Sequence, residues 1–570
     1  MAGHTLWLWL LAGAAAEAGA EEALRPQLQA SGEDNPADDV LTPGDWQRDD
    51  WTLVRPKVAL LEIGGYLRLH AETLRRMGLG RGQGTEVDPD GRPRQRYPGF
   101  GGSPDFSSTR MRLRLEPRIN IGERARIEST WDLLDNLVLG STPDSYYLRP
   151  DGRQQADVLS LSQVPPRRGV DSFSDAIVVK RLWGRLTAFN EQVELKVGRM
   201  PDHFGLGVVF NDGNGLEANW GTVVDRLALS FRAFEHVITP MVDWVGRGPL
   251  WLPFGAGDPM PLNATGRDDT MQYALRIQRR DHPDDVQDAL AHGRTAVSYG
   301  THHAFRLQPA SYITADLSPA AGNPPAPPVP TVDAVRQRRD AFLYLGDLWG
   351  SWQRGTWSLA AELALQAGHF TDALTGDNIT ESRTRVLKAG GAAEGRWRRR
   401  LDGQGLQLGL MTGAASGDAH RGMGALDAAD TQRGGDDRSL TNFAFHPDYH
   451  VDQLMFRRLI GQVTDAWYLR PEVGYRFDRQ WLGRVSAVYA QLLRPSSQAA
   501  GDGEVGPRPL GVEVDAELRL GPERPGPDGA VMASVVGGVL FPLGALDPTT
   551  LDRQGSRFAW TAQARMWLTF

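Results

Sequence analysis

The stretch Arg110-Met-Arg-Leu-Arg-Leu-Glu-Pro-Arg-Ile119 alternates charged and apolar residues without a break. Successive side chains of a β-strand point to opposite faces. The apolar face holds Met111, Leu113, Leu115, Pro117 and Ile119, and the charged face holds Arg110, Arg112, Arg114, Glu116 and Arg118. A helix cannot sustain this period. Enclosing the charged face in a protein core would cost roughly several kcal/mol for each unpaired charge. The stretch therefore predicts a strand with one lipid-facing and one water-facing side, as in a transmembrane β-barrel.

The same alternation recurs along the chain. It is found in Met271-x-Tyr-x-Leu-x-Ile277, Trp467-x-Leu-x-Pro-x-Val-x-Tyr-x-Phe477, Val512-x-Val-x-Ala-x-Leu518 and the final Ala562-x-Ala-x-Met-x-Leu-x-Phe570. A terminal phenylalanine closing an alternating strand is typical of outer-membrane barrels, and we expect the barrel assembly machinery to recognise it. The sequence predicts an all-β, antiparallel transmembrane barrel among the lipids of a Gram-negative-type outer membrane.

The connections between the predicted strands also alternate, between short turns and long extracellular loops. Short turns are predicted at Ile121-Gly-Glu123, Asn190-Glu-Gln192, Gly355-Thr356 and Asp478-Arg-Gln480. Long loops rich in Gly, Pro and Asp are predicted around residues 71–107, 139–174, 202–221, 248–269, 309–340, 371–383, 414–465, 494–508 and 544–556. Val451 to Val463 could be a strand, but this would break the alternation. Placing it in the preceding loop gives about eighteen strands, an even number, as such barrels require.

The N-terminal residues resemble an export signal. Leu6-Trp-Leu-Trp-Leu-Leu11 is a short apolar core and Ala18-Gly-Ala20 a cleavage site, although no Lys or Arg precedes them. We predict a signal peptide over residues 1–20, a flexible acidic periplasmic leader over 21–58 and the barrel over 59–570. The apolar stretch Ala530 to Leu546 is shorter than the ~20 residues of a spanning helix and favours a strand.

Composition excludes several classes of protein. The chain has 570 residues, no Cys, a net charge of -8 and 41% hydrophobic residues, with a mean hydropathy of -0.38. These values exclude a disulfide scaffold and a helical membrane bundle, and they give no basic surface for nucleic acid.

No catalytic motif is present. The sequence contains no GxSxG, HExxH or phosphate-binding loop. The run His446-Pro-Asp-Tyr-His-Val-Asp452 and the pair His302-His303 lie in a loop or on a strand, where adjacent side chains diverge, which disfavours a metal site. Gly205-Leu-Gly207 lacks a following helix and is predicted to be a loop. We expect no enzyme activity, no cofactor and no metal.

The C-terminal third resembles the alginate-export-type outer-membrane porins. The resemblance is carried by Phe443-Ala-Phe-His-Pro-Asp-Tyr449, Leu459-Ile-Gly461, Trp467-Tyr-Leu-Arg-Pro471, Leu510-Gly-Val-Glu-Val-Asp515 and Gly537-Gly-Val-Leu-Phe-Pro542. It implies a monomeric barrel of ~18 strands whose arginine-rich lumen passes an acidic polysaccharide. This chain departs from the family at His446, where a small residue or Asn is usual, and in its longer loops.

Strand parity predicts which side chains line the lumen. The arginines of this face are Arg110, Arg112, Arg114, Arg118, Arg124, Arg126, Arg226, Arg276, Arg470, Arg476, Arg484 and Arg565. Because guanidinium groups bind carboxylates and concentrate anions in a narrow tube, they indicate an anion pathway. The alternative is that they pair with acids such as Glu513, Asp515 and Glu517 and only stiffen the barrel.

The segment from Ala414 to Thr464 is the candidate for a constriction folded into the pore. Its aromatic residues would let it pack against the wall, and His446, Asp448, Arg457 and Arg458 are its candidate functional residues. The alternative is an ordinary outer loop.

Three functions remain open. The first is an outer-membrane, porin-like, anion-selective channel for anionic solutes, with possible export of an acidic polysaccharide. The second is a structural anchor barrel with a plugged lumen, and the third a secreted β-rich hydrolase. Charged inner strand faces argue against the hydrolase.

Overall fold

The computed structural model describes residues 60–79, 85–87, 93–95, 105–139, 177–189, 192–246, 250–251, 262–263, 268–279, 283–313, 335–373, 381–401, 404–418, 439–478, 480–494, 508–522, 529–546 and 558–570. The predicted signal peptide and leader lie outside these ranges.

One sheet forms the molecule's wall. It holds 19 strands, of which the short β18 (Ser439–Leu440) is a parallel addition to β16, so 18 strands form the closed antiparallel barrel. These are β1 (Leu61–Arg75), β4 (Phe106–Ile121), β5 (Ala125–Val138), β6 (Ile177–Ala188), β7 (Val193–Pro201), β8 (Val223–Ala233), β9 (His236–Gly246), β12 (Thr270–Arg279), β13 (Thr295–Ile313), β14 (Val335–Arg354), β15 (Trp357–Ala373), β16 (Glu381–Leu401), β17 (Gln404–Ala415), β19 (Ala466–Arg476), β20 (Trp481–Leu492), β21 (Pro509–Leu520), β22 (Ala530–Pro542) and β23 (Ala559–Thr569). The predicted all-β barrel is confirmed.

Closure comes from β1, which pairs with both β4 and β23. Tyr66 lies opposite Arg114 on one side and Thr569 on the other. Phe570 continues this seam, because its backbone N–H donates to Gly65 O at 3.1 Å and its carbonyl accepts from Gly65 N at 3.0 Å. The first and last strands of the barrel are therefore neighbours.

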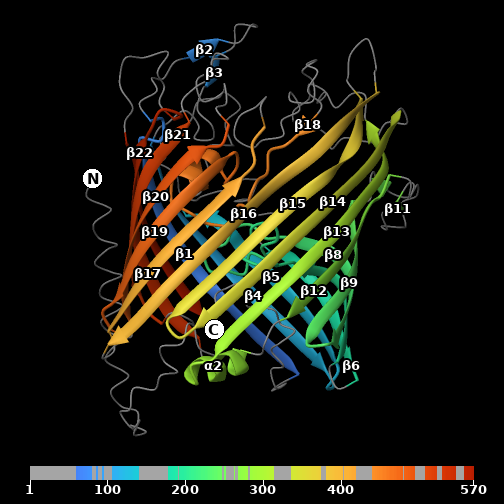
Figure 1. Cartoon of the computed structure of the whole chain (residues 1–570), viewed down its shortest axis with the longest axis horizontal. Coiled ribbons are helices and arrows are strands. Elements are labelled where there is room, and N and C mark those ends of the chain that lie inside the picture. Colours follow the sequence, from blue (N-terminus) through green and yellow to red (C-terminus); the bar gives the residue numbers. More distant parts are fainter. Residues whose placement is uncertain are drawn as a thin grey trace, which may run out of the picture. The chain divides into compact units, whose positions relative to one another are not determined.

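The rims differ as the sequence predicts. Turns such as Phe234–Glu235 and Gly355–Thr356 join strands at one rim, while the loops of residues 202–222 and 416–465 join strands at the other. Figure 1 shows α2 (Pro283–Ala291) at one end of the strands and the hairpin of β2 (Thr85–Val87) and β3 (Pro93–Gln95) at the other.

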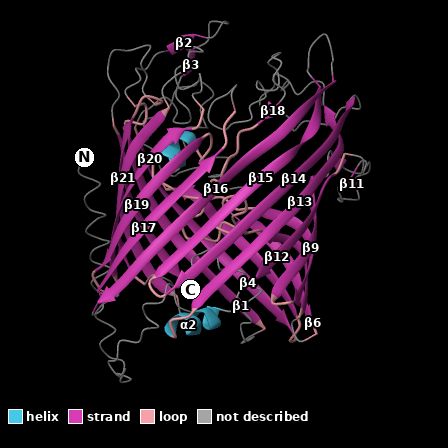
Figure 2. Ribbon diagram, viewed as in Figure 1, coloured by secondary structure: helices cyan, strands magenta, loops and turns pink. Residues whose placement is uncertain are grey.

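Few elements of the described ranges are not strands of the wall. The second small hairpin is β10 (Leu250–Trp251) with β11 (Leu262–Asn263). Figure 2 shows how little helix there is beside α2. Val451 to Val463 lies in a loop, as the alternation of connections requires, and contains a π-helix over Met455–Ile460.

The outward face is apolar. On β15, Leu363 is 60% exposed whereas its neighbour Glu362 is only 3% exposed, so the predicted alternation separates an outer apolar face from an inner polar one. Outward aromatic side chains lie near both rims, namely Trp357, Tyr475, Trp481 and Phe570 near the turns and Phe106, Tyr273, Phe305 and Phe541 near the loops. This is the arrangement of interfacial girdles around a membrane-spanning band.

Among the described residues, no helix is long and apolar enough to cross a membrane.

The hydrophobic core lies inside the barrel. The described parts of the loops 202–222 and 416–465 fold inward, and their apolar side chains pack against small inward residues of the wall. The cluster includes Phe204, Val208, Phe443, Phe445, Leu454, Phe456, Ala360, Ala364, Ala415 and Tyr468. The described parts of the two loops therefore lie inside the lumen and are joined to the wall by this core.

Candidate functional site

The loop between β17 and β19 is attached to the wall through Glu513. This β21 carboxylate accepts the backbone N–H groups of Gln453, Leu454 and Met455, each at 2.8 Å. Asp452 accepts the next two, from Phe456 at 2.8 Å and Arg457 at 3.0 Å. The free N–H groups at the start of the π-helix are thus satisfied by carboxylates, as helix N-termini favour.

The loop between β7 and β8 is attached in the same way. Glu362 on β15 accepts the N–H groups of four consecutive residues, Leu206 to Val209. Gly205 has φ +60° and a Cβ there would lie 2.4 Å from the Glu362 Oε2 atom, so glycine is required for this close approach. The predicted loop at Gly205-Leu-Gly207 is confirmed.

The two loops also bind each other. Asp448 accepts the N–H groups of Asn219 at 3.1 Å and Trp220 at 2.6 Å, and the His446 N–H donates to the Val208 carbonyl at 2.7 Å. Burial alone would raise the pKa of Asp448, but His450 and these amides hold it below its ordinary value. We call the described parts of the two loops, residues 202–222 and 439–465, the partition.

Buried arginines of the wall hold the partition's backbone. Arg68 donates to the carbonyls of Leu216 at 3.2 Å and Ala218 at 3.1 Å, and Arg112 donates to Ala218 at 2.8 Å. On β23, Trp567 Nε1 also donates to the Leu216 carbonyl, at 3.1 Å. These donors fix the backbone on both sides of Glu217.

Many of the predicted lumen arginines are paired with acids of the wall or with Asp202, which begins the loop between β7 and β8. Arg114 binds Asp132 at 2.6 Å, and Arg226 binds both Asp243 at 2.6 Å and Asp202 at 2.8 Å. The other short pairs are Arg112 with Asp135, Arg276 with Asp202, Arg110 with Glu72 and Arg470 with Glu472. These arginines therefore form the ion pairs with acids that the sequence analysis names as the alternative to an anion pathway.

The remaining predicted arginines occupy different positions. Arg124 is exposed in the turn between β4 and β5, so its predicted lumen position is wrong, because the turn comes one residue later than expected. Arg126 donates to Asn120 at 2.7 Å, Arg118 lies 3.9 Å from Glu128, and Arg476 ends β19 near the turn rim.

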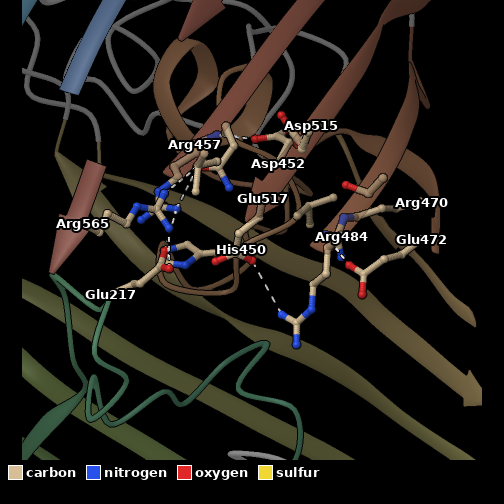
Figure 3. A pocket seen from close by; sticks show the side chains of 15 residues that line it. Glu217, His450, Asp452, Arg457, Arg470, Glu472, Arg484, Asp515, Glu517 and Arg565 are labelled. Atoms are coloured by element: carbon tan, nitrogen blue, oxygen red, sulfur yellow. Dashed lines mark hydrogen bonds and ion pairs between the residues drawn. The ribbon is translucent and has the colours of Figure 1, made fainter. Parts of the chain in front are cut away.

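The partition and the wall enclose a polar cavity of about 220 Å³ (Figure 3). Arg565 comes from β23, Arg470 from β19 and Arg484 from β20, and Arg457 and Glu217 come from the two inserted loops. Its other ionisable lining residues are His450, Asp452, Glu472, Asp515 and Glu517. Glu517 lies 3.7 Å from Arg484, whereas Glu513 binds the loop backbone, so the acids of β21 do not neutralise one arginine row.

In most ion pairs that face the lumen, the cation is the more exposed partner. Arg110 is 19% exposed and its partner Glu72 is 1% exposed, and Lys196 is 24% exposed while Glu194 is 0% exposed. The same order holds for Arg118 over Glu128, Arg458 over Glu72, Arg470 over Glu472 and Arg484 over Glu517. The lumen therefore presents guanidinium and ammonium groups in front of acids that lie deeper.

The four residues predicted for the constriction, His446, Asp448, Arg457 and Arg458, have different positions and partners in the structure. Of them, Arg457 lines the cavity, whereas Arg458 turns away to bind Glu72 at 2.5 Å. His446 and Asp448 join the two loops. Burial lowers the pKa of His446, which favours its neutral form.

Neither Glu217 nor Gln453 is indicated by the sequence alone. Both are single residues without a motif, and the inward course of the 202–222 loop depends on Glu362, far away in the chain. Within the described ranges, no group of His, Asp and Glu side chains is arranged to hold a metal ion.

No protein-family model and no curated protein sequence matches the chain. Solved structures do. A BenF-like porin from Pseudomonas fluorescens Pf-5 has a TM-score of 0.40 at 9% identity, covering 90% of this chain and 99% of that chain. OpdK from Pseudomonas aeruginosa has a TM-score of 0.39 at 9% identity, covering 89% and 98%. An anion-selective porin from Comamonas acidovorans has a TM-score of 0.33 at 9% identity, covering 90% and 99%. The resemblance to alginate-export-type porins is tested by none of these three and stays a prediction.

Proposed function

We propose that the protein is an outer-membrane, porin-like channel that passes anionic solutes past the partition. The observation that carries this proposal is the order of exposure in the lumen ion pairs, where the cation stands in front of its acid. An anion entering such a tube meets guanidinium groups first, although the chain as a whole has a net charge of -8.

The cavity offers the exchange of partners that conduction requires. Arg470 and Arg484 line the cavity and form ion pairs with Glu472 and Glu517. Each arginine can release its glutamate to bind the carboxylate of a solute, and can bind the glutamate again when the solute leaves. Conduction needs binding that is favourable enough for entry and weak enough for release.

An acidic polysaccharide is the finer proposal for the solute. Its successive carboxylates would suit arginines on neighbouring strands, through bidentate bonds. The partition packs against the wall inside the lumen, beside a cavity of about 220 Å³, so a polymer would have to displace part of the partition. The packed partition also favours a second candidate, an anchor barrel with a plugged lumen.

Reversal potentials across a KCl gradient in planar bilayers test the proposal. We expect a conducting channel with a preference for chloride. A folded protein that does not conduct would support the plugged anchor, and a cation preference would contradict the anion pathway. Retention in the outer membrane with heat-modifiable gel mobility separates both from a secreted hydrolase.

A further inference from the structure

Glu217 is an exception to the exposure order of the lumen. Its side chain is 32% exposed, while its partners Arg565 and Arg457 are 3% and 8% exposed. Here the acid stands in front and the two guanidinium groups lie behind it. A solute in the cavity meets this carboxylate before it can reach either arginine.

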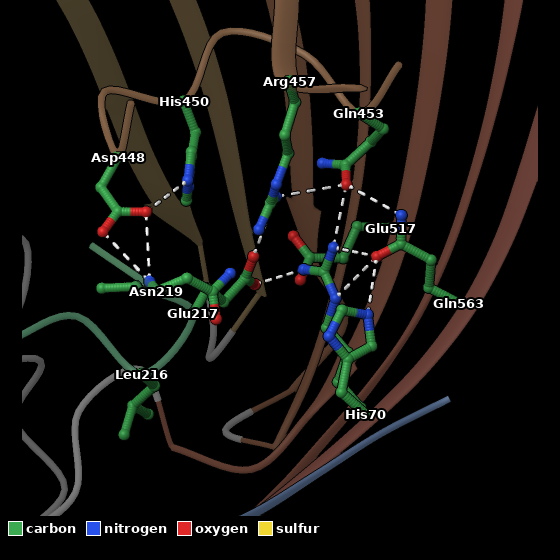
Figure 4. Close-up of polar contacts among 12 residues, drawn as sticks. His70, Leu216, Glu217, Asn219, Asp448, His450, Gln453, Arg457, Glu517 and Gln563 are labelled. Atoms are coloured by element: carbon green, nitrogen blue, oxygen red, sulfur yellow. Dashed lines mark hydrogen bonds and ion pairs between the residues drawn. The ribbon is translucent and has the colours of Figure 1, made fainter. Parts of the chain in front are cut away.

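Other residues hold the two arginines in place, and Figure 4 labels Gln453, Gln563 and His70 among them. Gln453 Oε1 accepts from Arg565 at 2.9 Å and from Arg457 at 3.5 Å, and Gln563 Oε1 accepts from Arg565 Nε at 3.1 Å. His70 in turn bonds Gln563 at 3.1 Å. Because these contacts do not involve Glu217, the paired guanidinium groups form a carboxylate site that Glu217 fills.

Glu217 cannot leave this site by moving its backbone. The carbonyls on either side of it, from Leu216 and Ala218, accept from buried donors of the wall, and the N–H of Asn219 donates to Asp448. Only rotation of the Glu217 side chain can vacate the arginines. Burial alone would raise the pKa of its carboxyl, but Arg565 and Arg457 lower that pKa below its ordinary value, so it remains ionised at neutral pH.

We propose that Glu217 is a built-in competitor that occupies the Arg457–Arg565 site in place of the carboxylate of a passing solute. A tethered ligand competes at a high effective concentration and weakens the apparent affinity of any free ligand. A solute carboxylate enters as the Glu217 side chain rotates away and is expelled when it returns. This sets specificity for anions that can bridge two guanidinium groups, and it prevents them from being trapped.

This inference rests on the proposed anion pathway, and titration calorimetry tests it separately from conduction. The probe is sodium glucuronate, added to the barrel folded in detergent. Glu217→Gln keeps the side-chain shape and removes the charge, so the variant should bind glucuronate about tenfold more tightly than the parent protein, the size expected when an intramolecular competitor is lost.

Glu517→Gln is the matched control, since it removes the same charge from the same cavity. Arg484, its partner, is already exposed, so the affinity for glucuronate should change by less than about twofold, as for a weak, solvated pair. The variant Glu217→Gln with Arg565→Met should lose the gain.

Three results would overturn the proposal. They are equal or weaker glucuronate binding by folded Glu217→Gln, an equal gain in Glu517→Gln, and a gain that survives Arg565→Met. Heat-modifiable mobility verifies folding, and Glu217→Ala provides a second variant with the same expected gain. A cation-selective parent protein would refute the proposed function instead, whatever the calorimetry shows.

Discussion

The Glu513 carboxylate, on β21, accepts the backbone N–H of Leu454 at 2.8 Å and is itself fully shielded from solvent. The N–H groups of Gln453 and Met455 share the same carboxylate. One wall side chain therefore fixes the start of the π-helix, and through it the position of Arg457.

Replacing Glu513 by Gln should loosen the partition. A hydrogen bond to a charged acceptor contributes about 1.5–3 kcal/mol, and the amide puts an N–H₂ group where N–H groups already point. We expect larger and noisier single-channel currents in planar bilayers, while the barrel remains heat-modifiable. Currents identical to those of the parent channel would mean that the hydrophobic packing alone holds the loop.

Replacing Arg470 and Arg484 together by Glu should reduce or invert the preference for anions. Both side chains reach the cavity and neither holds the partition's backbone. Reversal potentials measure the change. The same substitution at Arg112 and Arg114 is expected to impair folding instead, since these side chains hold Ala218 and Gly213 carbonyls. An unchanged preference in the first variant would place the selective groups elsewhere in the lumen.

Replacing Arg226 by Met should destabilise the barrel by roughly 3–5 kcal/mol, because Asp202 and Asp243 would lose a buried partner. Arg199 provides the matched control, since its pair with Asp225 at 2.7 Å is largely exposed. Arg199→Met should cost only about 0–1 kcal/mol. Urea unfolding in lipid vesicles measures the free energy of unfolding of both variants. Equal losses of stability in Arg226→Met and Arg199→Met would show that a buried ion pair contributes no more here than an exposed one.

Acid should weaken the junction between the two loops. The folded protein holds the pKa of Asp448 below its ordinary value, so its contribution to stability is complete above the unfolded pKa of ~3.9 and is lost as the pH falls through the lower folded value. Conductance should rise as the pH drops below about 4. Asp448→Asn should reduce this rise, and a pH response that is unchanged in the variant would assign it to other carboxyls.

The sequence predicts the wall much better than its contents. Alternation along the strand Arg110 to Ile119 depends on neighbouring residues only, so both faces follow from it. The strand number and the alternation of rims follow from the lengths of the connections, once Val451 to Val463 is placed in a loop. The partners that a side chain meets across the lumen cannot be predicted from this local pattern. The same inward parity applies to Arg114, which is buried against Asp132, and to Arg484, which is exposed to the cavity.

The inserted loops show the same limit. Aromatic residues between Phe443 and Phe456 predict that one loop packs inside, and the described part does so. The 202–222 loop also contains aromatic residues, and Phe204 and Phe210 are buried in the same core. Its course, however, is set by Glu362, whose pairing with four amides requires the barrel to exist first. A contact that depends on closure cannot be seen in local sequence.

The Leu216 carbonyl receives one donor from Arg68 on β1 and one from Trp567 on β23, the two strands that meet at the seam. Both donors are adjacent only after the last strand has found the first. Leu216 thus connects the first and the last strand of the barrel from the lumen side. This contact implies an order of assembly, in which β1 and β23 pair before the loop takes its final position. The barrel cannot complete its interior before its first and last strands have paired, so a barrel that is still open would lack these two hydrogen bonds to Leu216.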